Sequence, residues 1–205
     1  MKNRLVKLAI IFILLLAFLS LDCKNPFTTR ESPSPVGQEG DWNTPSSPTM
    51  AMENLFNSYN LKIIGNFSLC LSDSFRFSAY YDSIQAISEN KGWLFEDWDV
   101  SVEKGIADLL FATSRQAIDS LDFFLVWRPD PSQNDIIGDT TAVFYRDYTL
   151  YKLVGSPPET TIYQGLATFY LEETTFNWWG IYLWEDIPQQ VGQPDWADFK
   201  AEFRR

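Results

Sequence analysis

The second half of the chain alternates between long runs of β-branched and aromatic residues and short polar breaks. This pattern predicts strands over residues 121–127, 141–154, 161–171 and 178–186. The breaks between them contain glycine, proline or acidic residues. Because parallel neighbours would need crossovers of a dozen residues or more, these short links predict an antiparallel meander.

Helical spacing dominates the segment before the sheet. Apolar residues recur at i, i+3, i+4, i+7 and i+11 from Met52 to Ile63. This spacing predicts a helix that starts at Pro48, has Ser47 as its N-cap and ends at Gly65.

Shorter elements are expected around this framework. Asn66 is expected to cap a second helix, followed by a strand at 75–80 and one helical turn near 84–87. Asp99 is expected to cap another helix. Asp195 is expected to cap a closing helix with apolar residues at i, i+3 and i+7, namely Trp196, Phe199 and Phe203.

The first 22 residues have the composition of an export signal. Lys2, Arg4 and Lys7 form a basic start, and an almost unbroken apolar run follows from Leu8 to Leu21. At about 1.5 Å per residue, this run as a helix is well short of a hydrocarbon core of roughly 30 Å. A cleaved signal peptide over residues 1–22 is therefore expected rather than a permanent anchor.

Cys23 follows directly, and its placement resembles the lipobox of bacterial lipoproteins, in which the cysteine becomes the acylated first residue. Asp22 departs from the family pattern, which has a small residue just before the cysteine. The resemblance implies lipid attachment, palmitate included, at Cys23 and export to the cell envelope, anchored to the inner or the outer membrane. Ordinary secretion and an uncleaved signal anchor are the alternatives.

Residues 23–48 are then expected to be a lipidated cysteine followed by a disordered tether. Proline, serine, threonine and glycine are frequent there, so little apolar surface is available to offset the entropy of ordering. Trp42 is expected to dock onto the nearby domain. The folded domain itself is expected over residues 49–205.

The spacing Trp179-x-Ile181-x-x-Trp184-x-Asp186 resembles the final strand of the nuclear-transport-factor-2-like (NTF2-like) superfamily. Two helices and a short strand also open domains of this superfamily, so the resemblance covers roughly residues 47–186. It implies an α+β fold in which a curved antiparallel sheet packs on N-terminal helices as a cone. The closing helix is expected to be an addition to that fold.

Charge and residue types exclude several classes of function. The net charge is −11, so nucleic acid is not an expected partner. There is no histidine, which excludes Ser-His-Asp and Cys-His pairs and histidine-ligated metals. With two cysteines and no glycine-rich phosphate motif, no cofactor and no metal site is expected, and Cys70 is expected to be a small buried apolar residue.

Carboxylate and phenol chemistry remains available for an enzyme. The resemblance implies that a SnoaL-like or ketosteroid-isomerase-like enzyme would use an aspartate base in an apolar cone, with a tyrosine near the developing charge. No residue matches a catalytic motif of the superfamily, so the catalytic residues stay unassigned. The available groups are Tyr145, Tyr163 and Tyr182 with Asp73, Asp82, Asp99 or Asp147.

Binding without catalysis is the main expectation. The domain is expected to bind a small apolar ligand or a protein partner, with a homodimer through the sheet and a structural part in the envelope as alternatives. The interior of the cone decides between these roles. A filled cone favours partner binding or a structural role. An open apolar cavity favours a carrier, and a cavity with a buried Asp beside a Tyr hydroxyl favours an enzyme. The pocket or interface candidates are Trp98, Tyr145, Tyr163, Trp179 and Tyr182.

Overall fold

The computed structural model describes residues 42–115 and 121–204. The expected signal peptide, Cys23 and most of the expected tether lie outside these residues. Within the described ranges, no helix is both long enough and apolar enough to cross a membrane. Trp42, in the last part of the expected tether, packs against the apolar core of the domain, as predicted.

The first described helix, α2 (Pro48–Leu61), begins as the sequence predicts. Ser47 Oγ accepts a hydrogen bond from the backbone N–H of Met50 at 3.3 Å, and a proline takes the first helical position. The helix ends before Gly65, because Lys62 adopts a left-handed conformation with a φ of 57°. The predicted end is therefore too late.

The second helix, α3 (Ile64–Leu69), packs beside α2. Its N-cap is Ile63, which makes no side-chain cap. The prediction that Asn66 caps this helix is wrong, because Asn66 lies within the first turn and is buried. Cys70 follows the helix and is buried, and burial raises the pKa of its thiol to about 12, which agrees with the expected role of a small apolar residue.

Strand β1 (Leu71–Ser78) comes next and is followed by three helical elements. Asp99 caps the last of these as predicted, since its Oδ1 accepts from the backbone N–H groups of Ser101 and Val102 at 2.9 and 3.1 Å. The turn predicted at 84–87 is a longer helix. The three elements are α4 (Tyr80–Ser88), the short η1 (Gly92–Leu94) and α5 (Val100–Arg115).

The strands form one sheet in the order β1-β6-β5-β4-β2, with a two-residue strand β3 paired to β4. The neighbours among β2, β4, β5 and β6 are all antiparallel, which confirms the meander. The sequence did not indicate β3, nor that β1 lies parallel to β6. The bounds are β2 (Asp122–Pro129), β3 (Ile136–Ile137), β4 (Thr141–Val154), β5 (Glu159–Glu173) and β6 (Trp179–Pro188).

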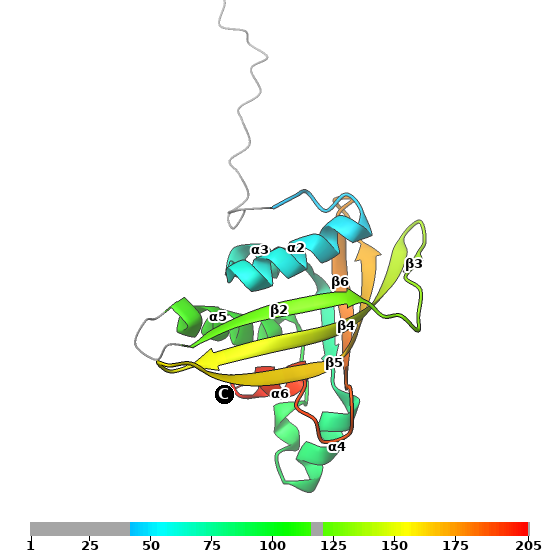
Figure 1. The fold of residues 1–205 in the computed structure, drawn as a ribbon. Coiled ribbons are helices and arrows are strands. Elements are labelled where there is room, and N and C mark those ends of the chain that lie inside the picture. Colours follow the sequence, from blue (N-terminus) through cyan, green and yellow to red (C-terminus); the bar gives the residue numbers. More distant parts are fainter. Residues whose placement is uncertain (1–41, 116–120, 205) are drawn as a thin grey trace, which may run out of the picture. The chain divides into compact units, whose positions relative to one another are not determined.

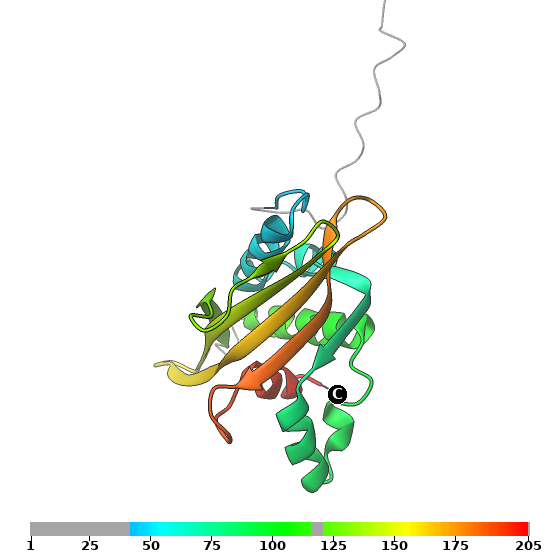
Figure 2. The same cartoon turned by 90° about the vertical axis from the view of Figure 1, so that its right-hand side faces the viewer.

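The sheet is curved, and its two faces differ. Between Tyr170 and Leu171 the pairing with β6 shifts so that Tyr182 is an extra residue, and such a bulge bends and twists a strand. Helices α2, α3, α5 and α6 lie on one side of the sheet (Figure 1), whereas Figure 2 shows its other side without a covering helix. The fold is therefore α+β, with a curved and largely antiparallel sheet packed on helices, as expected.

Helix α6 (Trp196–Ala201) belongs to the core of the domain. Its two aromatic side chains, Trp196 and Phe199, are 0 % exposed. The Trp196 ring centre lies 5.0 Å from the ring centres of both Tyr59 on α2 and Tyr148 on β4. The closing helix expected from the sequence is therefore present, and its apolar face packs on the concave side of the sheet.

Candidate functional site

A tyrosine on the concave side of the sheet reaches over its neighbouring strand. Tyr148 on β4 pairs with Gly165 on β5. A Cβ at Gly165 would lie 2.5 Å from the Tyr148 hydroxyl and 2.5 Å from the carbonyl oxygen of Ile187. Glycine is therefore required at this position, because any side chain would displace the tyrosine hydroxyl or the β6 backbone.

Two tyrosine hydroxyl groups fix the start of α6. The backbone N–H of Trp196 donates to the Tyr148 hydroxyl at 2.7 Å, and the Trp196 indole N–H donates to the Tyr59 hydroxyl at 2.7 Å. Burial raises the pKa of both phenols well above the ordinary value, so both stay neutral. Both N–H groups of Trp196 are thus satisfied inside an apolar environment.

A buried carboxylate lies beside this contact. Asp186 on β6 is 1 % exposed, and its Oδ2 accepts a hydrogen bond from the backbone N–H of Ala197 at 2.8 Å. Burial raises the pKa of Asp186 to about 7, while the nearby Tyr148 hydroxyl and Lys200 oppose that rise. An enzyme was expected to have a cavity in which a buried Asp lies beside a Tyr hydroxyl. Asp186 and Tyr148 provide this pair of groups, but the backbone of α6 occupies the space beside them.

A buried ion pair connects α6 to α5. Lys200 Nζ lies 2.8 Å from Glu103 Oε1 and 3.2 Å from the ring centre of Trp184. Glu103 also accepts a hydrogen bond from the indole N–H of Trp98 at 2.8 Å. Burial lowers the pKa of Lys200, and the charge of Glu103 counteracts this. Glu103 therefore neutralises the positive charge of Lys200 within the core.

Three further aspartates meet where α4 approaches α6. Asp82 belongs to α4, Asp195 is the N-cap of α6, and Asp198 lies in the first turn of α6. One carboxylate oxygen of each lies within 4.8 Å of the other two. We call these three residues the carboxylate cluster. Asp195 Oδ1 accepts from the Asp198 N–H at 3.1 Å and Asp198 Oδ2 from the Asp195 N–H at 3.4 Å, which makes a capping box.

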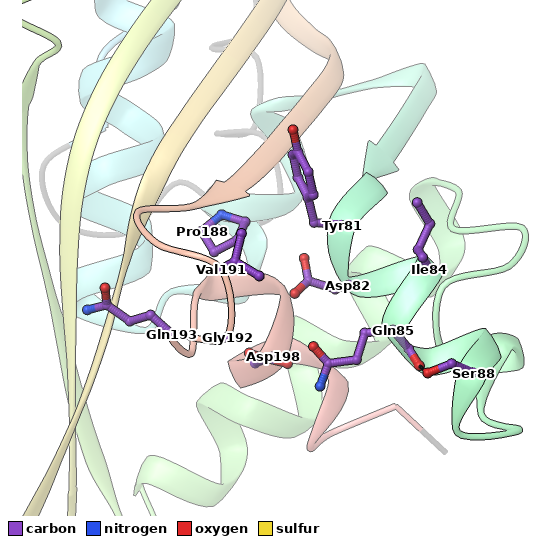
Figure 3. Close-up of a pocket in the computed structure, with 10 residues that line it drawn as sticks. All are labelled: Tyr81, Asp82, Ile84, Gln85, Ser88, Pro188, Val191, Gly192, Gln193 and Asp198. Carbon is purple, nitrogen blue, oxygen red and sulfur yellow. Dashed lines mark hydrogen bonds between the residues drawn. The ribbon is translucent and has the colours of Figure 1, made fainter.

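The carboxylate cluster adjoins a pocket between α4 and the segment that joins β6 to α6 (Figure 3). The pocket has a volume of about 390 Å³. Asp82 and Asp198 contribute carboxylates to its lining (Figure 3), whereas Asp195 is 0 % exposed and does not line it. Tyr81 and Val191 supply apolar surface at the pocket, so one region combines apolar walls with negative charge.

Burial and mutual repulsion change how the carboxylate cluster titrates. Burial, with the charges of Asp186 and Asp82, raises the pKa of Asp195 to about 10. Burial and then the charge of Asp198 raise the pKa of Asp82 to about 6. The Oδ2 atoms of Asp82 and Asp195 are buried and accept no hydrogen bond from any described residue. The cluster therefore requires a proton or a cation to neutralise it.

The five residues predicted for a pocket or an interface do not form one site. Trp98, Tyr163 and Trp179 are buried, and the Tyr163 hydroxyl donates to Glu202. Tyr145 is half-buried on the face opposite to its buried β4 neighbours. Tyr182, the bulge residue, lies 6.2 Å from the ring of Tyr170. None of the five lines the pocket beside the carboxylate cluster.

Of the four aspartates considered as bases, the structure places Asp82 at the pocket and the others elsewhere. Asp99 is the cap of α5, and Asp147 accepts from Arg128 at 2.6 Å on the uncovered face of the sheet. Asp73 is exposed on β1. Of these four, only Asp82 therefore lines the pocket beside the carboxylate cluster.

Three residues of the site have no functional signal in the sequence. The sequence indicates Asp186 as the polar end of a strand and Asp195 as a helix cap. It indicates no structural or functional role for Asp198. The spacing Asp195-x-x-Asp198 is the available signal, but it indicates only a helix start. Their approach to Asp82 depends on how α4 packs, which no local pattern specifies.

No family model matches the sequence, and no curated protein matches it. Solved structures that are similar to this chain include an NTF2-like superfamily protein from Salmonella enterica serovar Typhimurium, 14 % identical, which covers 70 % of this chain and 92 % of that chain with a TM-score of 0.46. A ketosteroid isomerase-like protein from Erwinia carotovora is 7 % identical, over 69 % and 93 % of the two chains, with a TM-score of 0.46. ActVI-ORFA from Streptomyces coelicolor is 6 % identical, over 70 % and 92 %, with a TM-score of 0.45. The similarity concerns the course of the backbone alone.

Proposed function

We propose that this chain is an exported, membrane-anchored protein whose NTF2-like domain binds a protein partner without catalysis. The observation that carries the proposal is the burial of α6 on the concave side of the sheet. Trp196 and Phe199 are both 0 % exposed there. A filled cone favours partner binding or a structural role over a carrier or an enzyme.

Opening the cone to a small ligand would be energetically demanding. Removal of one buried Trp or Phe side chain typically costs about 3–5 kcal/mol. Moving Trp196 and Phe199 together would therefore use much of the roughly 5–15 kcal/mol that stabilises a typical domain. The concave side consequently supports the helix rather than a ligand.

Uptake of an apolar dye tests this part of the proposal. The full-length chain is titrated with 8-anilinonaphthalene-1-sulfonate, whose fluorescence rises in an apolar cavity. We expect no saturable binding to the native protein and an increase only as the protein unfolds. Saturable binding of about one dye per chain to the native protein would show an open cavity and refute the proposal.

An enzymatic function is the second candidate, because Asp186 is buried next to the Tyr148 hydroxyl and the pKa of Asp186 is raised to about 7. A base with a pKa near neutrality suits proton transfer. The test compares the wild type with Asp186→Asn on enolisable ketone substrates. Turnover by the wild type that the variant loses would favour the enzyme, whereas equal background rates in both favour the binding domain.

The uncovered face of the sheet is the surface that we propose for the partner. Phe124, Tyr151 and Ile162 occupy one row across β2, β4 and β5. The Phe124 and Tyr151 rings stack at 4.6 Å, and Phe124 and Ile162 remain 41 % and 45 % exposed. Val126, next on the same face of β2, is 51 % exposed. These four residues are called the outer-face row.

A second copy of the same chain is the partner that fits the outer-face row best. The chain carries a net charge of −11, so two copies repel unless they meet where the surface is close to neutral. The nearby charges Arg128 and Asp147 neutralise each other at 2.6 Å. Because the outer-face row is apolar and the adjacent Arg128 and Asp147 neutralise each other, the uncovered faces of two copies can meet with little repulsion.

The oligomeric state in solution tests this partner. We expect light scattering to report a dimer for the wild type and a monomer for Ile162→Glu, because two introduced charges would face each other. Ile137→Glu is the matched control, since Ile137 is 58 % exposed on β3 and lies away from the row. A monomeric wild type, or a dimer that Ile162→Glu leaves intact, would refute the homodimer.

Membrane attachment through Cys23 rests on the sequence pattern of residues 1–23, which lie outside the described part of the chain. Acyl chains contribute about 0.8 kcal/mol for each buried CH₂ group, so an acylated cysteine would hold the domain at a membrane surface. Mass spectrometry of the protein purified from membranes checks it. We expect a mature chain that begins at an acylated Cys23, and an unmodified N-terminus would remove this part of the proposal.

A further inference from the structure

We infer that Asp82, Asp195 and Asp198 form a binding site for a divalent cation of the size of Ca²⁺, at the end of the pocket between α4 and α6. The proposed dimer and this site use different parts of the molecule. The inference therefore stands independently of the proposed function.

The separations in the carboxylate cluster are compatible with a calcium ion. One oxygen from each aspartate lies within 4.8 Å of the other two. Ca²⁺ binds oxygen ligands at about 2.3–2.6 Å, so two ligands on opposite sides of it are about 4.6–5.2 Å apart. An ion between the three carboxylates would reach all of them with little movement of the chain.

Two oxygens of the cluster are buried without a hydrogen-bond donor from the described residues. Asp195 is 0 % exposed, and its Oδ2 has no hydrogen-bond partner among the described residues, although its Oδ1 caps α6. Asp82 Oδ2 is also buried without a partner. A buried carboxylate oxygen without a donor is costly, and a cation removes that cost.

The described lysines near the carboxylate cluster already form ion pairs with other residues. Lys200 is paired with Glu103 inside the core at 2.8 Å. Lys91, which lines a second depression beside Asp82 and Asp198, pairs with Glu89 at 3.0 Å. Asp186 lies near Asp195 and adds a further acidic group to this region. Neither of these two lysines is therefore left to neutralise the carboxylate cluster as it ionises.

The identity of the donors selects the class of cation. Carboxylate oxygens are hard ligands, which suit Ca²⁺ and Mg²⁺ rather than softer transition metals. Mg²⁺ requires about 2.0–2.1 Å and a near-ideal octahedron and gives up its own waters reluctantly, whereas Ca²⁺ accepts irregular sets of carboxylate oxygens such as this one. The pocket of about 390 Å³ in front of the cluster admits a hydrated ion and leaves room for water ligands.

A shared proton is the competing account. Asp82 and Asp195 lie close enough for one protonated carboxyl to donate to the other, and a proton would satisfy both buried oxygens. The two accounts differ in what Ca²⁺ does. Only the cation site predicts that Ca²⁺ stabilises the protein.

Thermal unfolding of the full-length chain at pH 7.5 distinguishes them. The protein is first treated with EGTA and then measured with 1 mM CaCl₂ or 1 mM MgCl₂. At a concentration about a hundred times Kd we expect Ca²⁺ to raise Tm by roughly 5 °C. Mg²⁺ should have a clearly smaller effect, and isothermal titration should give one site per chain.

Three variants test the residues. Asp82→Asn and Asp198→Asn should each raise Tm in EGTA, because repulsion is relieved, and should lose the Ca²⁺ shift. Asp195→Asn keeps an oxygen to cap α6 and should weaken Ca²⁺ binding at least tenfold. Asp139→Asn is the matched control, since Asp139 is exposed away from the cluster, and it should keep the full shift.

Several results would overturn the inference. No Ca²⁺ shift in the wild type would leave the shared proton as the explanation. A shift that persists in both Asp82→Asn and Asp198→Asn would place the binding elsewhere on this acidic chain. An equal or larger effect of Mg²⁺ would contradict the assignment by size.

Discussion

The backbone N–H of Trp196 donates its hydrogen bond to the hydroxyl of Tyr148, 2.7 Å away on a strand of the sheet. The first N–H groups of a helix have no partner within the helix and normally find one in a cap or in water. Here the partner is a buried phenol from β4, which Gly165 leaves room for. The sheet therefore determines where α6 starts.

Removal of that phenol oxygen should destabilise the protein. Tyr148→Phe would leave the Trp196 N–H buried without an acceptor, which costs about 1–3 kcal/mol. Urea unfolding measures the change. Tyr182→Phe is the matched control, because Tyr182 is half-buried away from α6, and we expect less than about 0.5 kcal/mol for it. Equal effects of the two variants would contradict the assigned role of Tyr148.

Two glycine substitutions should act in opposite directions. Gly165→Ala would place a Cβ 2.5 Å from the Ile187 carbonyl oxygen and the Tyr148 hydroxyl, so we expect a loss of about 1–3 kcal/mol. Gly105→Ala meets no atom within 4 Å on α5, so we expect a gain of about 0.5–1 kcal/mol. Thermal unfolding of both variants checks the signs. A tolerated alanine at Gly165 would mean that Tyr148 is placed differently.

The sequence predicted the individual helices and strands better than it predicted how they pair and pack. The caps at Ser47, Asp99 and Asp195 and the strand 141–154 could be predicted because each depends on neighbouring residues. The parallel pairing of β1 with β6 could not, because it joins segments that are distant in the chain. The apolar positions of α6 are visible in the sequence, but no local pattern shows that the concave side of the sheet receives them.

The same distinction applies to the site. Asp82 could be considered as a base because it is an aspartate near an aromatic segment, but its partners Asp195 and Asp198 are visible only as helix-capping residues. The raised pKa values and the unsatisfied oxygens of Asp82 and Asp195 arise from burial between α4 and α6, which depends on tertiary packing. Tyr145 and Tyr182 show the converse, since they are strand tyrosines that do not line the pocket beside the carboxylate cluster.

The buried Asp186 should make stability depend on pH. Its folded pKa of about 7 lies above the ordinary 3.8, so the folded protein retains a proton that the unfolded chain releases. The free energy of unfolding should therefore fall as the pH rises from about 4 to 7. Asp186→Asn cannot ionise and should show a smaller fall. Urea unfolding at several pH values in EGTA measures both slopes.

The ionisable groups around Asp186 determine how much the pH dependence of stability differs between the wild type and Asp186→Asn. Asp82 and Asp195 also have raised pKa values and lie near Asp186, so they should retain part of the slope in the variant. Lys200 and the Tyr148 hydroxyl face Asp186 as well and favour its charged form. Identical slopes for wild type and variant would show that Asp186 is not protonated in the folded state near pH 6.

Thiol counting should report on both cysteines. Burial raises the pKa of the Cys70 thiol to about 12, so we expect no reaction of Cys70 with a disulfide reagent such as 5,5′-dithiobis(2-nitrobenzoic acid) at pH 8 in the native protein. After unfolding, one thiol per chain should react if Cys23 is acylated. Two reactive thiols would refute acylation, and a reactive native Cys70 would contradict its burial.

The central claim is that α6 is part of the core and fills the cone, and native-state hydrogen exchange tests it most directly. The N–H groups of Trp196 and Ala197 bond to Tyr148 and Asp186. We predict that they exchange only with global unfolding, at the same free energy as the amides in the middle of β5. Exchange of these two amides well before those of β5 would show that α6 detaches from the sheet, and would contradict the account.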